Sequence, residues 1–163
     1  MTDPLLTTVE IEPAGAVRSS VIWMHGLGAD ANDFGPIVPE MRLPTELGIR
    51  FVFPNAPVRP VTINGGMRMR AWYDVLSMDL PRREDPEGVY ASERGIFALA
   101  EREKRRGIPA ERIVLAGFSQ GGAMALHAGL RYPDRLAGIL ALSCYIPLAV
   151  KLDSERRPDN QHT

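Results

Sequence analysis

The sequence has one cysteine, three histidines, no long apolar run and almost no net charge. Because a single cysteine cannot form an internal disulfide, the chain lacks the cystine framework typical of small secreted domains. We therefore expect a reducing compartment and a cytoplasmic location. Cys144 ends an apolar run, so it is interpreted as a small core residue rather than a reactive thiol.

Export and membrane insertion are not indicated either. Residues 1–8 have neither the basic start nor the apolar stretch of a signal peptide. The longest apolar segment, residues 136–150, is shorter than the ~20 residues that a membrane span requires, and it contains Pro147. No membrane span is predicted.

Charge and histidine content limit the partners and cofactors. Nineteen basic and twenty acidic residues leave a net charge of −1, so the broad basic surface of a nucleic-acid-binding protein is not expected. The densest basic cluster, residues 101–106, alternates with acids and is interpreted as a solvated helix end. The histidines lack ligand spacing, so no metal is predicted. With 163 residues, 45% of them apolar, the chain is expected to form one globular domain.

Short apolar runs alternate with segments of helical periodicity. Strands are predicted at residues 7–11, 20–24, 49–53, 113–116 and 138–143, the first at a sheet edge and the last covered on both faces. Helices are predicted from Asn32 or Asp33 to just before Pro44, from Ser92 to about Arg106, and from the turn after residue 116 to about Tyr132. This alternation predicts an α/β fold with a mainly parallel sheet between two helical layers.

Two segments read as irregular. Residues 55–86 contain many prolines and glycines, and long loops of this kind in a compact domain are usually functional. Trp72 and Tyr73 in this loop either line a pocket or cover the core. Residues 151–163 are polar and are predicted to be a loop or tail.

The segment Gly117-Phe118-Ser119-Gln120-Gly121 joins a predicted strand to a predicted helix. A serine on such a turn has its hydroxyl exposed over a helix N-terminus, and the turn needs small residues two positions before and after it. We interpret Ser119 as a nucleophile; the alternative is an ordinary βα turn with this sequence.

Acyl transfer by such a serine passes through an oxyanion that needs fixed N–H donors. In a nucleophile elbow one donor is the backbone N–H after the serine, here Gln120. The second comes from a loop after an earlier strand, and His25-Gly26-Leu27-Gly28 is such a loop, which nominates the N–H of Leu27. His25 is expected to be a buried, hydrogen-bonded loop residue.

Four motifs occur in order: residues 25–28, 53–58, 65–74 and 117–122. In this combination the chain resembles bacterial carboxylesterases of the acyl-protein thioesterase (phospholipase/carboxylesterase) family, in the α/β-hydrolase superfamily. The resemblance implies a three-layer α/β-hydrolase fold and cofactor-free hydrolysis of small carboxylic esters or thioesters by a Ser-Asp-His triad. It further implies an acyl-enzyme on Ser119, backbone oxyanion donors at Leu27 and Gln120, and substrate contacts from Leu27 and Trp72. Lactone opening by the same nucleophile remains an alternative.

The chain departs from this pattern after the nucleophile. His127 lies eight residues along the expected helix, roughly 12 Å from the elbow at ~1.5 Å per residue, and is interpreted as a surface or packing residue. His162 lies in the polar tail. Asp134, Asp153 and Asp159 do not occupy the family's acid position. We therefore expect one incomplete domain, residues 1–163, that ends after the strand following the nucleophile helix and lacks the triad acid and histidine.

Loss of a triad histidine lowers turnover by about 10⁶-fold, so the chain is predicted to be inactive or very weak as an esterase. The alternative is a non-catalytic fragment or remnant that self-associates, for example as a homodimer, through the exposed edge of the strand at residues 138–143.

Overall fold

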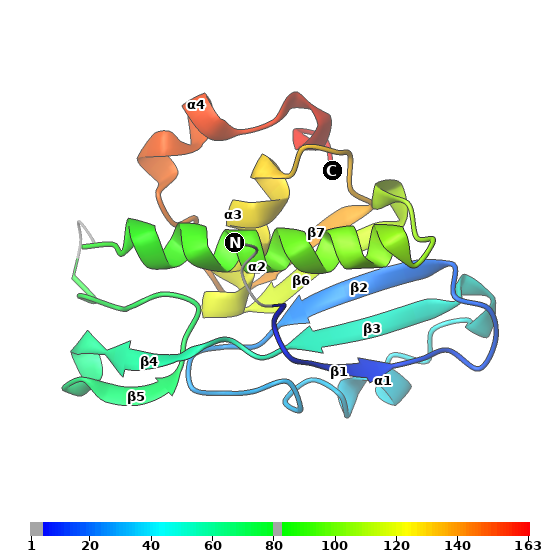
Figure 1. Cartoon of the computed structure of the whole chain (residues 1–163), viewed down its shortest axis with the longest axis horizontal. Helices are drawn as coiled ribbons and strands as arrows, with labels where there is room; N and C mark the ends of the chain where they lie inside the picture. The colour runs from blue at the N-terminus through cyan, green and yellow to red at the C-terminus, as the bar shows by residue number, and fades with distance from the viewer. Residues whose placement is uncertain (1–4, 80–82) are drawn as a thin grey trace.

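A computed structural model describes residues 5–79 and 83–163. Its central sheet has five strands in the order β1-β3-β2-β6-β7 (Figure 1). The strands are β1 (Thr8–Ile11), β2 (Ser19–Met24), β3 (Ile49–Pro54), β6 (Ile113–Phe118) and β7 (Gly138–Leu142). β1 pairs with β3 in the antiparallel sense, and the other neighbours are parallel. The predicted strands and the mainly parallel sheet are confirmed.

Each face of the sheet has its own apolar core. α2 (Pro86–Arg105) and α3 (Gln120–Arg131) cover one face, where Ile22 belongs to the larger cluster of buried side chains. The short α1 (Ile37–Glu40) and the turns around it cover the other face, where Trp23 is buried against Phe34. Because β2 buries side chains on both faces, its sequence is a continuous apolar run rather than an alternating one. The result is the expected three-layer arrangement (Figure 1).

Two of the three predicted helix starts were wrong. α2 begins at Pro86, and the Asp85 side chain caps it by accepting a hydrogen bond from the Gly88 N–H at 2.9 Å. Ser92 is instead buried inside this helix, where its hydroxyl donates to the Trp72 carbonyl. The helix expected from residue 32 or 33 to 43 contracts to α1, because Pro36 and Pro39 cannot donate the backbone bonds that a longer helix needs.

The segment predicted to be irregular contains a hairpin. β4 (Val58–Val61) and β5 (Met67–Arg70) pair in the antiparallel sense, joined through a 3₁₀ turn (Thr62–Asn64). Pro60 in β4 weakened the strand signal, although proline is tolerated in a two-stranded sheet where both strands are edges. The Arg70 carbonyl accepts a hydrogen bond from the Gly28 N–H at 2.8 Å, which ties the hairpin to the loop after β2.

The C-terminal residues are not a free tail. They form two 3₁₀ turns (Ala149–Lys151 and Pro158–Asn160) around α4 (Leu152–Glu155). The buried Asn160 side chain accepts from the Leu136 N–H at 2.8 Å and donates to the Tyr132 and Asp134 carbonyls at 3.0 and 2.8 Å. The Tyr90 hydroxyl and the Arg131 Nε donate to the Glu155 carboxylate at 2.6 and 2.7 Å. The segment predicted to be a polar loop or tail thus contains short helical turns that side-chain contacts hold against the domain, and the described residues add no further strand.

β7 is the last strand of the sheet in the described part of the chain, and it is only half covered. Ile139 packs against α3 at Gly129, whereas Leu140 and Leu142 are 41% and 37% exposed. The prediction of burial on both faces was wrong, since none of the described elements covers Leu140 and Leu142. The prediction of an unpaired apolar edge agrees with this topology among the described residues.

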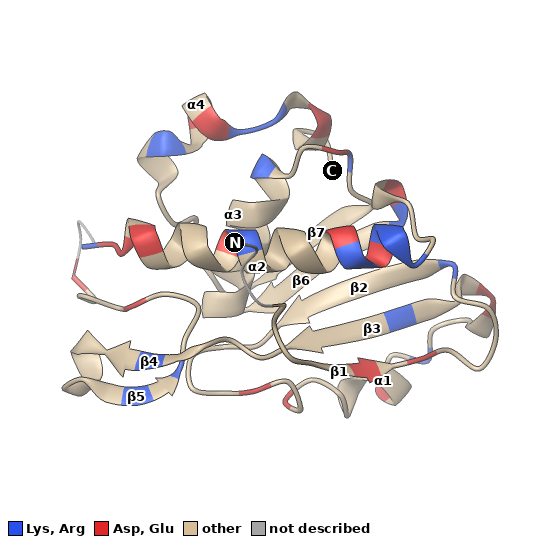
Figure 2. Ribbon diagram, in the orientation of Figure 1, with Lys and Arg blue, Asp and Glu red and all other residues tan. Residues whose placement is uncertain are grey.

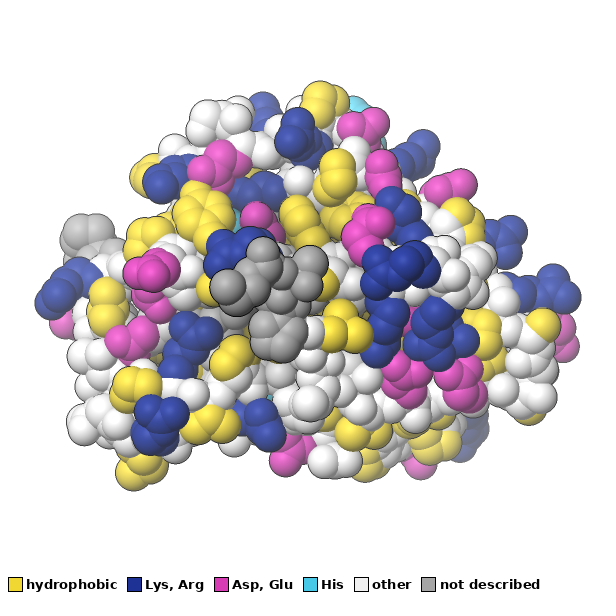
Figure 3. Space-filling view, viewed as in Figure 1, with side chains coloured by type: hydrophobic (Ala, Val, Ile, Leu, Met, Phe, Trp, Pro, Cys, Tyr) yellow, Lys and Arg dark blue, Asp and Glu magenta, His cyan; other side chains and the backbone are white. Residues whose placement is uncertain are grey.

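Charged residues are mixed over the surface rather than segregated. Acids and bases alternate near the C-terminal end of α2 (Figure 2), and both signs are interspersed on the face seen in Figure 3. Within this cluster Arg50 and Glu103 form a buried ion pair at 2.8 Å, and Arg102 pairs with Glu10 at 2.6 Å. These pairs join α2 to β1 and β3, so the cluster is structural. Among the described helices, none has the length and apolar character to cross a bilayer.

Candidate active site

Ser119 lies at the elbow between β6 and α3, in a backbone conformation that non-glycine residues rarely adopt. Its φ is 54° and its ψ is −120°. Such a conformation costs about 1–3 kcal/mol and persists only where the surroundings enforce it. Here the Ser119 N–H donates to the Leu142 carbonyl at 2.9 Å, and the Ser119 carbonyl accepts from Ala123 at 2.9 Å. The residue is half-buried.

Two glycines make the elbow sterically feasible. A Cβ atom on Gly117 would collide with the Gly121 carbonyl, and a Cβ atom on Gly121 would collide with the Met24 and His25 carbonyls. The start of α3 therefore lies directly against the end of β2 and its following loop. This close approach brings the loop at residues 25–28 next to Ser119, as the sequence predicted.

A cavity of about 440 Å³ opens beside Ser119. Its lining is largely apolar, with a few hydroxyl groups and one thiol. The lining residues are Leu27, Ile63, Tyr73, Val75, Met78, Ser119, Gln120, Ser143, Cys144 and Tyr145. Among the described residues no histidine and no carboxylate lines it. Within the described part of the chain, the cavity therefore contains a candidate nucleophile but no side chain suited to be its general base.

Two backbone N–H groups at this cavity are candidates for oxyanion donors. Leu27 follows β2, and the hydrogen bonds formed by the described residues include none donated by its N–H. Gln120 is the first residue of α3, where the N–H groups have no intrahelical acceptor and the helix dipole favours negative charge. Both residues line the cavity together with Ser119. The two donors and the nucleophile nominated from the sequence thus meet at one site.

The Gln120 side chain has a role that the sequence did not reveal. Its Oε1 accepts from the Trp72 N–H at 2.7 Å, and its Nε2 donates to the Tyr73 carbonyl at 2.8 Å. The side chain is buried, and both its ends are satisfied by backbone groups about fifty residues away. This amide fixes the segment after β5 against the elbow.

Trp72 does not line the cavity. Its side chain is fully buried, and its indole N–H donates to the His25 carbonyl at 2.9 Å. The prediction of a substrate contact from Trp72 was therefore wrong, and the alternative of a core ring is confirmed. Tyr73 lines the cavity instead, and its hydroxyl lies 3.0 Å from that of Tyr145. Successive side chains of an extended segment point to opposite sides. Continuing this alternation past β5 would have placed the side chains of Trp72 and Tyr73 on opposite sides of the segment.

The histidines and acids after the elbow do not complete a triad within the described residues. His127 is fully buried on α3, with its Nε2 2.8 Å from Glu93, which confirms the packing interpretation. His162 is exposed and does not line the cavity, and Asp134 pairs with Lys104 at 2.6 Å. In the same part of the chain no group of three or more His, Cys, Asp or Glu side chains could hold a metal ion.

Cys144 is half-buried and packs against the main core while also lining the cavity. Burial raises the pKa of its thiol, which disfavours the nucleophilic thiolate. Ser119 is therefore the stronger candidate for the nucleophile.

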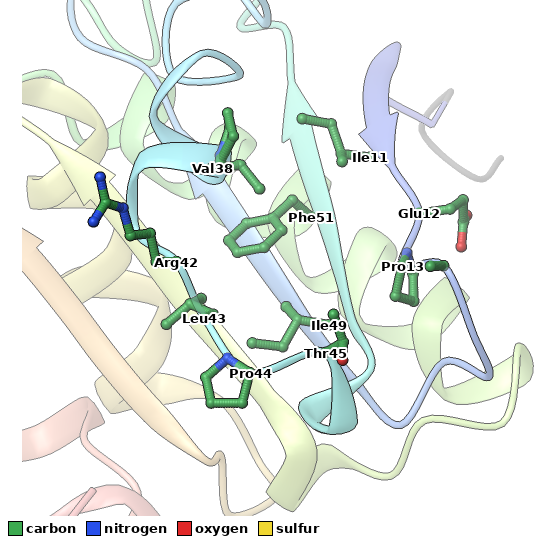
Figure 4. Close-up of a pocket in the computed structure, with 12 residues that line it drawn as sticks. Ile11, Glu12, Pro13, Val38, Arg42, Leu43, Pro44, Thr45, Ile49 and Phe51 are labelled. Carbon is green, nitrogen blue, oxygen red and sulfur yellow. The ribbon is translucent and has the colours of Figure 1, made fainter.

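A second cavity, of about 210 Å³, lies on the α1 side of the sheet beside Phe51 (Figure 4). Val38, Leu43 and Ile49 give it an apolar wall. Its one carboxylate, Glu12, is paired with Arg50 at 2.8 Å. It shares no lining residue with the Ser119 cavity and contains no serine, cysteine or histidine. The chemistry of the site therefore belongs to the first cavity.

A strained serine between a parallel strand and a helix, with free N–H groups beside it, is the geometry of the α/β hydrolases. The chain belongs to the phospholipase/carboxylesterase family, whose model matches residues 7–161. It is 42% identical over 149 residues to acyl-protein thioesterase 1 of Schizosaccharomyces pombe, covering 91% of this chain and 66% of that protein. It is also 42% identical over 139 residues to acyl-protein thioesterase 1 of Neurospora crassa, covering 82% and 57%.

The structure is similar to the crystal structure of Arabidopsis thaliana SOBER1, with a TM-score of 0.83 and 30% identity over 88% of this chain and 70% of that one. The predicted α/β-hydrolase fold and family are confirmed. The chain spans two thirds or less of the two fungal relatives' length. Because those relatives are fungal, the bacterial subtype stays a prediction.

Proposed function

We propose that the protein hydrolyses carboxylic esters or thioesters through an acyl-enzyme on Ser119. The observation that supports this most directly is the strained serine at a cavity also lined by Leu27 and Gln120. The Ser119 hydroxyl gives its proton to hydroxide or water, its oxygen bonds to the carbonyl carbon, and the two backbone N–H groups stabilise the oxyanion. Collapse of this intermediate breaks the bond to the leaving oxygen or sulfur, which takes a proton from water and departs as the alcohol or thiol. A second water then hydrolyses the acyl-serine to the carboxylic acid and restores the Ser119 hydroxyl.

The substrate class follows from the lining. Leu27, Ile63, Val75 and Met78 offer apolar surface to an acyl chain, while the reactive carbonyl faces the few polar groups near Ser119. The named relatives are acyl-protein thioesterases, which favours an aliphatic ester or thioester over a lactone. No cofactor is required by this chemistry. We further propose a cytoplasmic location, because the single cysteine excludes an internal disulfide.

We propose that turnover by these 163 residues alone is very slow. No general base lines the cavity among the described residues, and loss of the triad histidine costs about 10⁶-fold in turnover. The oxyanion donors and binding would still leave roughly 10³-fold over water.

A fluorophosphonate probe tests the assignment directly. It is expected to label the chain slowly and at Ser119 alone, as mapped by peptide mass spectrometry, with hydrolysis of a nitrophenyl butyrate measured alongside. Ser119→Ala should abolish labelling, whereas Ser143→Ala, which alters another hydroxyl of the same cavity, should retain it. Labelling that persists in Ser119→Ala would contradict the proposal.

The second candidate function is a non-catalytic fragment that self-associates. The observation that favours it is the outer edge of β7, which no other described strand pairs with, together with the exposed Leu140 and Leu142. Antiparallel pairing of two such edges gives a symmetric dimer. Sedimentation velocity at increasing concentration should then reveal a dimer that Leu140→Lys dissociates. A concentration-independent monomer would remove this candidate.

A further inference from the structure

We propose that His25 is a positioning residue that orients the Leu27 N–H for the oxyanion. This inference rests on the proposed function. The side chain of His25 is buried, and both ring nitrogens have partners: Nδ1 lies 2.7 Å from the Gly26 carbonyl oxygen, and Nε2 lies 3.0 Å from the Ala56 backbone nitrogen.

These two partners define a single tautomer. The Ala56 N–H can only donate, so the Nε2 of His25 must accept and carries no proton. The ring proton is therefore on Nδ1, which donates to the Gly26 carbonyl. With both nitrogens engaged, His25 has no free position from which to exchange a proton with a substrate. Its role is to hold the loop.

The group that His25 holds is the peptide that contains the candidate donor. The Gly26 carbonyl and the Leu27 N–H belong to one planar peptide unit, in which they point in opposite directions. A bond that fixes the carbonyl therefore fixes the N–H as well. Gly26 has no side chain to restrict its backbone rotation, so this peptide depends on external bonds for its orientation. The Ala29 N–H supplies a weaker second bond to the same oxygen at 3.2 Å.

His25 also connects the two candidate oxyanion donors to each other. Its carbonyl accepts from the Trp72 indole at 2.9 Å, and the Trp72 N–H donates to the Gln120 Oε1 at 2.7 Å. The His25 and Trp72 rings lie 5.3 Å apart. A continuous chain of contacts thus runs from Leu27 through His25 and Trp72 to Gln120. The relative placement of the two N–H groups is set by this chain.

Burial lowers the pKa of His25, and Arg70 adds to the effect, against opposing contributions from the Gly26 bond and from Asp30 and Asp33. The neutral ring that both hydrogen bonds require is therefore the stable form at neutral pH. A protonated ring would direct an Nε2 proton at the Ala56 N–H.

Two variants separate positioning from packing. In His25→Asn the side-chain NH₂ falls near the place of Nδ1 and retains the bond to Gly26, but the acceptor for Ala56 is lost. In His25→Gln the side-chain oxygen reaches the place of Nε2 and retains the acceptor for Ala56, but the donor to Gly26 is lost. Each variant loses one buried hydrogen bond, so similar losses of stability are expected.

The rate constant for acylation of Ser119 is measured with nitrophenyl butyrate. The proposal predicts that His25→Asn keeps this rate constant within about threefold of the wild type, whereas His25→Gln lowers it by about 10–100-fold. The KM for nitrophenyl butyrate should change little in either variant. Nuclear magnetic resonance gives a readout independent of activity: the ¹⁵N order parameter of the Leu27 amide should stay at its wild-type value in His25→Asn and fall in His25→Gln. Equal rates and equal order parameters in the two variants would overturn the proposal.

The experiment also distinguishes the two levels of inference. If the Ser119→Ala variant is acylated at the same rate as the wild type, the proposed function fails. The order parameters of the Leu27 amide then still show whether His25 orients this N–H. If acylation depends on Ser119 but His25→Gln matches His25→Asn in both measurements, the proposed function stands and the role of His25 fails.

Discussion

The Gln120 side-chain oxygen lies 2.7 Å from the Trp72 backbone nitrogen, although the two residues are 48 positions apart. Gln120 thus contributes to the site twice. Its backbone N–H is a candidate oxyanion donor, and its side chain holds the segment that leads from the β4–β5 hairpin to the wall of the cavity.

Replacing this amide by a hydrocarbon tests that relationship. In Gln120→Leu the buried Trp72 N–H loses the acceptor that the Gln120 side chain supplies, and an unsatisfied buried donor costs about 1–3 kcal/mol. Urea unfolding should show a destabilisation of at least this size, about 1–3 kcal/mol. The control Gln161→Leu changes an exposed glutamine and should stay within about 0.5 kcal/mol of the wild type. Equal stability of the two variants would show that the amide bonds contribute nothing.

The strained backbone at Ser119 predicts a trade-off between stability and function. Ser119→Ala and Ser119→Gly both remove the candidate nucleophile, but only glycine adopts a φ of 54° without steric cost. We expect Ser119→Gly to be more stable than Ser119→Ala by about 1 kcal/mol in denaturant unfolding, with fluorophosphonate labelling abolished in both. The opposite order of stability would contradict the strain argument.

The absence of a base from the described cavity lining predicts an unusual pH dependence of labelling. With a triad histidine, whose ordinary pKa is about 6.5, the labelling rate levels off above neutral pH. Without such a base the serine must lose its proton to hydroxide, so the rate should rise about tenfold per pH unit through pH 9. Quenching the fluorophosphonate reaction at fixed times, at several pH values from 6 to 9, measures the labelling rate. A plateau near pH 7 would reveal an internal base.

The Glu155 contacts predict that part of the stability is lost in acid. Desolvation raises the pKa of this carboxyl, but hydrogen bonds from Tyr90 and Arg131 outweigh it and hold the pKa below the ordinary value of 4.5. A carboxyl with a lowered folded-state pKa contributes its full stability above its ordinary pKa, and the contribution disappears as the pH falls through the lowered value.

Denaturant unfolding between pH 6 and 3 should therefore show that wild type loses more stability than Glu155→Gln, which cannot be protonated in this range. Glu87→Gln, which changes a glutamate in the first turn of α2, serves as the control. Its loss of stability between pH 6 and 3 should match that of the wild type. Identical pH profiles for the wild type and Glu155→Gln would mean that α4 is not held by this charge.

Local patterns carried the successful predictions. The strands were predictable because β2, β3 and β6 are buried apolar runs, and the elbow was predictable because Gly117 and Gly121 occupy positions where any side chain collides. Both signals depend on residues that are neighbours in sequence.

Contacts between distant residues explain the failures. Asp85 and Ser92 are both good helix caps, but Asp85 caps α2, whereas Ser92 lies inside the helix and bonds to the Trp72 carbonyl, twenty residues away. Asn160 looked like part of a polar tail because its partners lie 24 to 28 residues earlier. The bonds of His25 to Ala56 and of Gln120 to Trp72 are of the same kind.

The Ser119 N–H donates a hydrogen bond to the Leu142 carbonyl of β7, and the residues just after this strand form a wall of the cavity. We expect a polypeptide that added itself along the outer edge of β7 to restrict the backbone that carries this carbonyl. Occupancy of the sheet's margin would then also limit how far the Ser119 backbone can move.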